Sequence, residues 1–290
     1  TRRPLSLWLS LWLYTVPVTL LCRLAGLDVS LGALRWAAFP ASTRQLWFIS
    51  DYLVLLLCVP LLNRLLRGLP RRAHKGVLLV LAVPLILYPT LFGQDGILAD
   101  TAWMFLYDYL LAAYLRRWPD NRLSQFLNRP AAALALGLGL PLANTAVRAV
   151  LEWQGATDSK AFQYIAYYRT ALGALPGLLA ALALFHFFKN WDLGSNRFIN
   201  ALAGTTLGVY ILHQVPVLRD FLWNGIFHAQ AHHGSAGYTL LVIVLTFAGC
   251  AAIDALRTRL IMQPLQRSRA FTALCAKGDA LAAEIAKPND

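Results

Sequence analysis

The sequence predicts an all-α fold, a polytopic bundle of transmembrane helices, and three observations point to it. Hydrophobic residues make up 58% of the 290 residues and charged residues only 14%, whereas soluble domains carry about 25% charged residues. The mean hydropathy is +0.53. Apolar runs of the length that crosses a bilayer core, about 20 residues, recur from one end to the other. We therefore expect one membrane domain over residues 1–269, followed by a tail over 270–290.

Eight apolar runs bounded by charged or turn-forming residues predict about eight spans. In order, they are Leu5 to Leu27, Leu46 to Leu66, Val77 to Phe92, Ile97 to Leu115, Ala131 to Leu151, Tyr164 to Phe188, Ala201 to Phe221 and Tyr238 to Leu256. Prolines inside a lipid-embedded bundle predict kinks, because neighbouring helices or water can satisfy the freed carbonyls. They are Pro17, Pro60, Pro84, Pro141 and Pro176. The tail is expected to form a short cytoplasmic helix with a frayed end.

Positive charge alternates between the connections and orients the predicted spans. The segments after the second, fourth, sixth and eighth runs are richer in Lys and Arg than the others. This places both termini in the cytoplasm by the positive-inside rule. The net charge of +12 is thus explained by topology, and no nucleic-acid partner is expected. Tryptophans near the run ends fit interfacial positions: Trp47, Trp103, Trp118, Trp153, Trp191 and Trp223.

Ionisable groups inside spans are costly, so each is a functional hypothesis. Asp108 lies near the middle of the fourth run. It either pairs with Arg148 or Arg169 on neighbouring helices or faces a polar cavity. The alternative for the two arginines is that they snorkel to the membrane surface. His213, in the seventh run, carries an imidazole that can transfer a proton near neutral pH. A hydrogen-bonded packing role is its alternative.

Three further polar residues lie nearer the run ends. Asp51 follows the start of the second run, at a depth that is either interfacial or functional, and His186 and Asp254 are expected to be solvated at cytoplasmic ends. No motif of soluble enzymes is present. Four cysteines far apart indicate packing and neither disulfides nor a metal site.

Three segments together resemble the acyltransferase 3 superfamily of bacterial membrane O-acyltransferases. The first runs from Leu46 to Leu53 (LWFISDYL) and on through Cys58 to Leu66 (CVPLLNRLL). The second is Phe105 to Arg117, which closes in Tyr-Leu-Arg-Arg before a basic segment. The third, Asn200 to His213, ends in Gly-Val-Tyr-Ile-Leu-His. They occur in the family's order and spread across most of the chain.

The resemblance implies a protein of the bacterial inner membrane that transfers an acyl group, with acetyl expected, from cytoplasmic acyl-CoA to a hydroxyl of a cell-surface glycan or glycolipid. No metal is implied. His213 matches the family's signature histidine, and Arg2 and Arg3 correspond to basic residues thought to lie near the donor's phosphates, with a topological role as the alternative. Asp108, Arg148, Arg169 and His213 are the candidates for lining a passage for the acyl group.

One feature of the family is missing from this sequence. Its general-base histidine stands eleven residues after an Arg or Lys in the first span, but Leu5 to Leu27 holds no histidine and looks like the family's third span. We therefore expect two further spans before Thr1, which would bring the total to about ten. A transporter or flippase of lipid-linked sugars is the main rival, and a glycan polymerase ranks third. The acyl group, the acceptor and the oligomeric state stay open.

Overall fold

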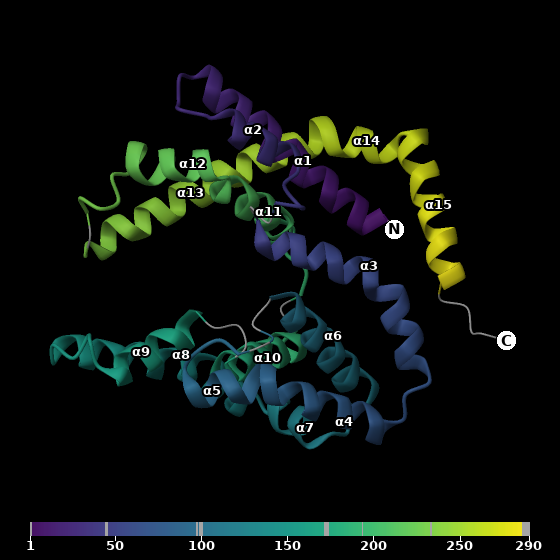
Figure 1. Ribbon diagram of the computed structural model, residues 1–290, viewed down its shortest axis with the longest axis vertical. Helices are drawn as coiled ribbons and strands as arrows, with labels where there is room; N and C mark the ends of the chain where they lie inside the picture. The colour runs from purple at the N-terminus through teal and green to yellow at the C-terminus, as the bar shows by residue number, and fades with distance from the viewer. Residues whose placement is uncertain are drawn as a thin grey trace. The chain divides into compact units, whose positions relative to one another are not determined.

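The computed structural model describes residues 2–43, 46–96, 98, 101–170, 174–192, 194–232 and 234–285, and excludes the side chains of residues 169 and 170. Every regular element in these ranges is a helix (Figure 1), so the all-α prediction is confirmed. The chain divides into two compact units. Unit 1 comprises Thr1–Arg64 and Ser195–Asp290, and unit 2 comprises Leu65–Gly194.

Unit 1 is built from the two ends of the chain. Its elements are α1 (Arg2–Leu24), α2 (Leu31–Ala38), most of α3 (Trp47–Arg67), α11 (Arg197–Gln214), α12 (Pro216–Asp220), the π-helix η2 (Phe221–Ile226), α13 (Ala236–Arg257), the π-helix η3 (Thr258–Met262), α14 (Gln263–Arg267) and α15 (Arg269–Ile285). Helix α1 packs against α2, α11 and α12, and α11 packs along α13.

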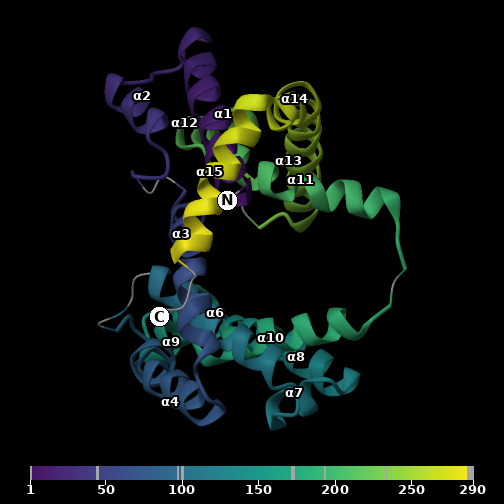
Figure 2. The same cartoon turned by 90° about the vertical axis from the view of Figure 1, so that its right-hand side faces the viewer.

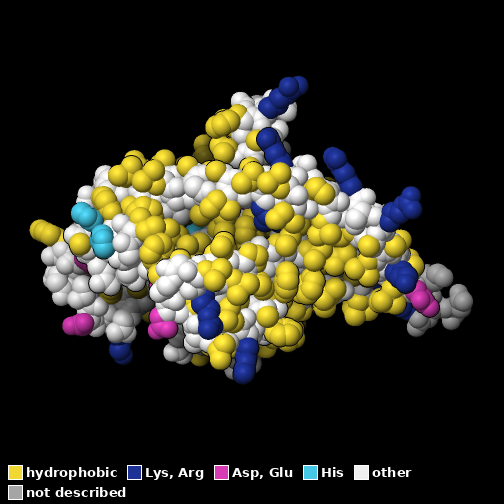
Figure 3. Space-filling model, turned by 90° about the horizontal axis from the view of Figure 1, so that it is seen from above, with side chains coloured by type: hydrophobic (Ala, Val, Ile, Leu, Met, Phe, Trp, Pro, Cys, Tyr) yellow, Lys and Arg dark blue, Asp and Glu magenta, His cyan; other side chains and the backbone are white. Residues whose placement is uncertain are grey.

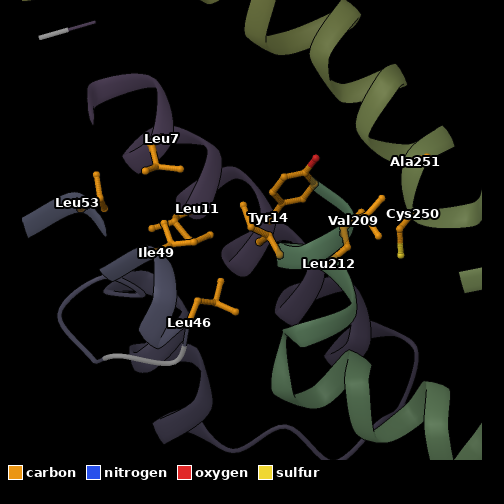
Figure 4. Packing of buried hydrophobic residues seen from close by; sticks show 11 residues of the cluster. Leu7, Leu11, Tyr14, Leu46, Ile49, Leu53, Val209, Leu212, Cys250 and Ala251 are labelled. Carbon is orange, nitrogen blue, oxygen red and sulfur yellow. The ribbon is translucent and has the colours of Figure 1, made fainter. Parts of the chain in front are cut away.

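The core of unit 1 lies where α1, α3, α11 and α13 meet (Figure 4). Leu11 and Ile49 are fully buried, and Leu212 is 2% exposed. The Tyr14 hydroxyl points away from the leucines toward α13, the helix that carries Cys250 and Ala251. Burial of these side chains holds α1 against elements from the other end of the sequence.

Unit 2 contains the middle of the chain. Its elements are α4 (Arg71–Ala82), the π-helix η1 (Val83–Leu87), α5 (Tyr88–Phe92), α6 (Thr101–Arg117), α7 (Arg122–Leu127), α8 (Pro130–Trp153), α9 (Lys160–Thr170) and α10 (Leu175–Asn190). Helices α8 and α10 lie side by side (Figures 1 and 2), and α4 packs against α6. Gly137 permits the close approach of α8 and α10, because a Cβ there would lie 2.8 Å from Leu184.

Five described helices are long and apolar enough to cross a membrane, and a sixth span results if one bent pair counts as a single span. They are Arg2–Leu24, Trp47–Arg67, Arg71–Phe92, Pro130–Trp153 and Ala236–Arg267, with Arg197–Gln214 and Pro216–Ile226 as the bent pair. Helix α10 is apolar but shorter, at 16 residues. The membrane architecture is therefore supported, while the predicted count of eight is not confirmed. Hydrophobic side chains cover much of the face in Figure 3, as lipid contact requires.

The two predicted spans that contain Pro176 and Pro216 are each divided between separate helices in the described part of the chain. Pro216 disfavours the α conformation at Val215, where ψ is 120°, and the flanking helices are bent by 80°. Pro176 lies in the first turn of α10, where proline is favoured. It therefore starts a helix, and the prediction that it kinks a continuous span is wrong.

The other prolines within helices are accommodated. Pro17, Pro60 and Pro141 lie inside helices that continue through them. Pro84 lies within η1, and Pro264 follows η3 by two residues, so both stand at π-helical turns, whose wider spacing relieves the clash of the proline ring. The predicted tail helix is observed as α15, and the frayed end predicted beyond it falls at 286–290, outside the described residues.

Candidate active site

A polar seam runs along one face of α1. Arg2, Ser6, Ser10 and Tyr14 follow one another at intervals of four residues, the spacing that aligns side chains on a helix. The seam meets α13, η3 and α14, which run in the opposite direction. Arg257 Nη1 lies 3.4 Å from Ser10 Oγ, and Gln266 Nε2 donates to Ser6 Oγ at 3.2 Å. The Tyr14 hydroxyl donates to the carboxylate of Asp254.

The inner end of the seam is a buried ion pair. Arg257 Nη2 donates to Asp254 Oδ1 at 2.9 Å, and its guanidinium carbon lies 4.4 Å from the centre of the Tyr14 ring. Asp254 is only 3% exposed. Gly208 on α11 makes the room for it, since a Cβ at Gly208 would lie 2.2 Å from Asp254 Oδ1. Two donors thus satisfy the buried carboxylate.

This geometry corrects the expectation of a solvated Asp254. The helix does not end near it, because η3 and α14 extend the run to Arg267. His186, also expected to be solvated, is likewise buried, with Nδ1 2.9 Å from Asn128 Oδ1. Both positions lie against neighbouring helices, a tertiary arrangement that apolar periodicity alone does not reveal.

A cationic groove with a volume of about 610 Å³ opens at the outer end of the seam. Its lining residues are Arg2, Arg3, Ser6, Leu7, Ser10, Tyr52, Leu56, Leu207, Arg257, Thr258, Met262 and Gln266. Three guanidinium groups line it, and the part of the chain that the structure describes gives the buried Nε of Arg257 no hydrogen-bond partner. Arginine pairs with phosphate and carboxylate oxygens through two parallel hydrogen bonds, so the groove suits an anionic ligand.

The groove contains two residues that the sequence singled out and one that it did not. Arg2 and Arg3 are exposed and line the groove together, and their role beside the phosphates of a donor stays a prediction. Arg257 stood out in the sequence only as part of a basic segment. The sequence contains two signals for a buried pair: Arg257 follows Asp254 by three residues, and polar residues recur every four residues along α1.

His213 occupies the last turn of α11, beside the helix break. Its Nδ1 lies 2.6 Å from the Val209 carbonyl oxygen, which can only accept, so Nδ1 carries the proton. Its Nε2 then accepts from the Gln214 amide at 3.1 Å. With Nδ1 donating, Nε2 is the ring atom that presents a lone pair.

A smaller hollow of about 340 Å³ lies at the helix break. Its lining comes from α1, α2, the turn after α2 and the first residues of α12: Thr19, Ala33, Trp36, Thr43, Pro216 and Val217. Leu11 and Thr15, both fully buried, lie on α1 between this hollow and the cationic groove. Irregular backbone within a membrane is tolerated where protein buries it or where it lines a cavity, and Val215, at the break, is 1% exposed.

The remaining predicted residues occupy separate places. Asp108 is exposed on α6, whereas Arg148 pairs with Glu152 at 2.8 Å and lies over the Phe162 ring. The Arg169 side chain lies outside the described residues. Asp51 is buried, at 6% exposure. The structure thus brings Arg2 and Arg3 together and partners Arg148 with Glu152 on its own helix.

Comparison with known proteins identifies the family. A family model described as "Acyltransferase domain" matches residues 1–255. No curated protein and no solved structure was found to match the chain. The matched region includes the α1 seam, His213 and Asp254, and ends two residues before Arg257. Because the match covers most of the 290 residues, the chain belongs to the acyltransferase 3 family, as the resemblance of its three segments predicted.

Proposed function

We propose that this protein is a membrane O-acyltransferase that uses acyl-CoA, with acetyl-CoA as the expected donor, and acylates a hydroxyl of a cell-surface glycan or glycolipid. Membership of the family supports acyl transfer. The observation that carries the choice of donor is the cationic groove, where Arg2, Arg3 and Arg257 line one hollow. Coenzyme A carries several phosphate groups, which such a cluster recognises.

The buried partners of Arg257 would make this site rigid. Asp254 and the Tyr14 ring hold the guanidinium of Arg257, and Arg257 lines the groove. A side chain already held in place loses less conformational freedom when a ligand binds. The proposal assigns the groove's arginines to the cytoplasmic side, where acyl-CoA is found, because the positive-inside rule favours that orientation.

The proposed reaction joins an acceptor oxygen to the acyl carbon. A base removes the hydroxyl proton as the oxygen attacks the thioester carbonyl, the carbon–sulfur bond breaks, and the coenzyme thiolate leaves and receives the proton. His213 Nε2 is the candidate for that base within this chain, once the Gln214 amide turns away from it. We propose the inner membrane of a bacterium as the location, with both termini in the cytoplasm.

The experiment is an acyl-transfer assay with the product of the complete gene in proteoliposomes. Radiolabelled acetyl-CoA is supplied with membrane glycolipid from the native host, and label in the glycolipid is measured. We expect KM for acetyl-CoA to rise about tenfold in Arg257→Gln and in the double variant Arg2→Gln/Arg3→Gln. A tenfold change corresponds to the loss of one charge-assisted hydrogen bond, which contributes about 1.5 kcal/mol.

A matched control removes the same charge elsewhere. Arg267→Gln/Arg269→Gln alters two exposed arginines outside the lining of the groove and should leave KM within twofold. An unchanged KM in the groove variants would remove the donor assignment while leaving acyl transfer intact. Movement of glycolipid across the bilayer without consumption of acetyl-CoA would instead support the transporter alternative.

A further inference from the structure

Unit 2 contains a second cationic groove, formed by α4, α6 and the start of α7, with a volume of about 620 Å³. Its polar lining residues are Arg71, Arg72, Lys75, Asp120, Asn121 and Arg122. Arg71 Nη1 pairs with Asp120 Oδ2 at 2.6 Å. The four basic side chains outweigh that single carboxylate, so the groove keeps a net positive charge of three.

The groove is polar at one end and apolar at the other. On α4, Arg72, Lys75 and Leu79 follow at spacings of three and four residues, which sets charged and aliphatic side chains on one stripe. Helix α6 packs against α4, and His74 Nε2 donates a hydrogen bond to the Leu110 carbonyl oxygen at 3.0 Å between them. The apolar lining consists of Leu78, Leu79, Tyr107, Leu111, Tyr114, Leu115 and Leu123.

The apolar end continues onto the surface of α4 and the start of η1. Leu79 is 59% exposed, Val80 is 71% exposed, and Val83, one turn further on, is 55% exposed. These side chains belong to a helix that is long and apolar enough to cross a membrane. A ligand seated on the basic residues could therefore extend along aliphatic side chains into the lipid. This combination of phosphate-binding charge and chain-binding surface matches a phospholipid better than a small water-soluble anion.

We propose that this groove binds an anionic phospholipid, with its phosphate at Arg72, Lys75 and Arg122 and an acyl chain along Leu79 and Leu111. Arg71 and Asp120 close the polar end through their ion pair. Basic pockets between membrane helices recognise lipid headgroups through this chemistry. The proposal concerns unit 2 alone and does not rest on the acyl-donor groove of unit 1.

The test is native mass spectrometry of the full chain in detergent, titrated with phosphatidylglycerol or phosphatidylcholine. We expect preferential binding of phosphatidylglycerol, and the variant Arg72→Gln/Lys75→Gln/Arg122→Gln should weaken it at least tenfold. The charge-matched control Arg267→Gln/Arg269→Gln/Lys277→Gln alters exposed residues outside both grooves and should stay within twofold. If the triple variant fails to fold, Arg72→Gln and Arg122→Gln alone should each weaken binding about threefold.

Competition separates the lipid from other phosphate ligands. Two soluble competitors should fail to displace the lipid when each is present at the same concentration as the lipid: inorganic phosphate, and glycerophosphoglycerol, which is the headgroup without acyl chains. The variant Leu79→Ser should weaken lipid binding. Equal binding of phosphatidylglycerol by the triple variant and its control would overturn the proposal. Displacement by the free headgroup or by coenzyme A at equal concentration would also overturn it, because the groove would then be a site for a soluble anion.

Discussion

The Tyr14 hydroxyl on α1 donates a hydrogen bond to Asp254 on α13, a residue 240 positions away in the sequence. The same carboxylate accepts from Arg257, whose guanidinium lies against the Tyr14 ring. Each of the three groups therefore positions the other two. Because Arg257 also lines the cationic groove, the stability of unit 1 and the shape of its groove depend on the same contacts.

Loss of the Asp254 carboxylate should be strongly destabilising. Asp254→Ala leaves the guanidinium of Arg257 without its counter-charge in a largely buried position, and breaking such a pair costs about 3–5 kcal/mol. Tyr14→Phe removes one hydrogen bond and should cost about 1 kcal/mol. Thermal unfolding in detergent, followed by circular dichroism, measures both.

The double variant Asp254→Ala/Arg257→Met is the control for this prediction. It leaves no unpaired charge, so its loss of stability should be smaller than that of Asp254→Ala alone. A double variant that unfolds more readily than the single one would show that the pair stabilises unit 1 through packing and not through charge neutralisation.

Gly208 should be intolerant of a side chain. A Cβ at this position would lie 2.2 Å from Asp254 Oδ1 and 2.6 Å from Asp254 Cβ, so α11 and α13 would have to separate. Gly208→Ala should therefore lower the unfolding temperature and weaken donor binding. Gly204→Ala, one turn earlier on the same helix, meets nothing within 4 Å. It should leave stability unchanged or raise it by up to about 1 kcal/mol through helix propensity. Equal effects of the two substitutions would contradict the close approach of the helices.

The membrane fold could be predicted from the sequence because lipid imposes a long apolar run on every spanning helix. Breaks within runs were harder to predict. Pro17 and Pro141 lie inside continuous helices, whereas Pro216 separates two helices. The difference is tertiary, since Val215, the residue before Pro216, is buried and held in a non-helical conformation with ψ of 120°. Composition and spacing carry no such information.

The candidate site also contains some residues that the sequence points to and others whose surroundings only the structure shows. The family resemblance predicts Arg2 and Arg3, and the motif that ends in His213 predicts that histidine, and these roles stay predictions. Asp254 was expected to meet solvent because it stands near the end of an apolar run. Its burial depends on Tyr14 and Gly208, which come from distant helices. Contacts between helices that are distant in the chain cannot be recognised from one sequence alone.

Arg148 should contribute little to stability. It forms an ion pair with Glu152 four residues later, and the two side chains are 28% and 45% exposed. Pairs of this kind contribute about 0.3–0.5 kcal/mol. Arg148→Gln and Glu152→Gln should therefore change the unfolding temperature by similar small amounts. A loss of acyl transfer confined to Arg148→Gln would give the arginine a role beyond this pair, as expected of a residue lining a passage for the acyl group.

His213→Asn should separate the two roles open to this histidine. The asparagine amide nitrogen can replace Nδ1 and donate to the Val209 carbonyl, but the side chain has no counterpart of the Nε2 atom. If Nε2 takes the acceptor proton, turnover should fall at least about a hundredfold, the lower range for loss of a general base. KM for acetyl-CoA should stay within about threefold, because His213 is not among the lining residues of the cationic groove. The assay is initial-rate acyl transfer in proteoliposomes, with thermal unfolding as the control for folding. Turnover equal to that of the parent protein would assign His213 to packing at the helix break and locate the base on another residue.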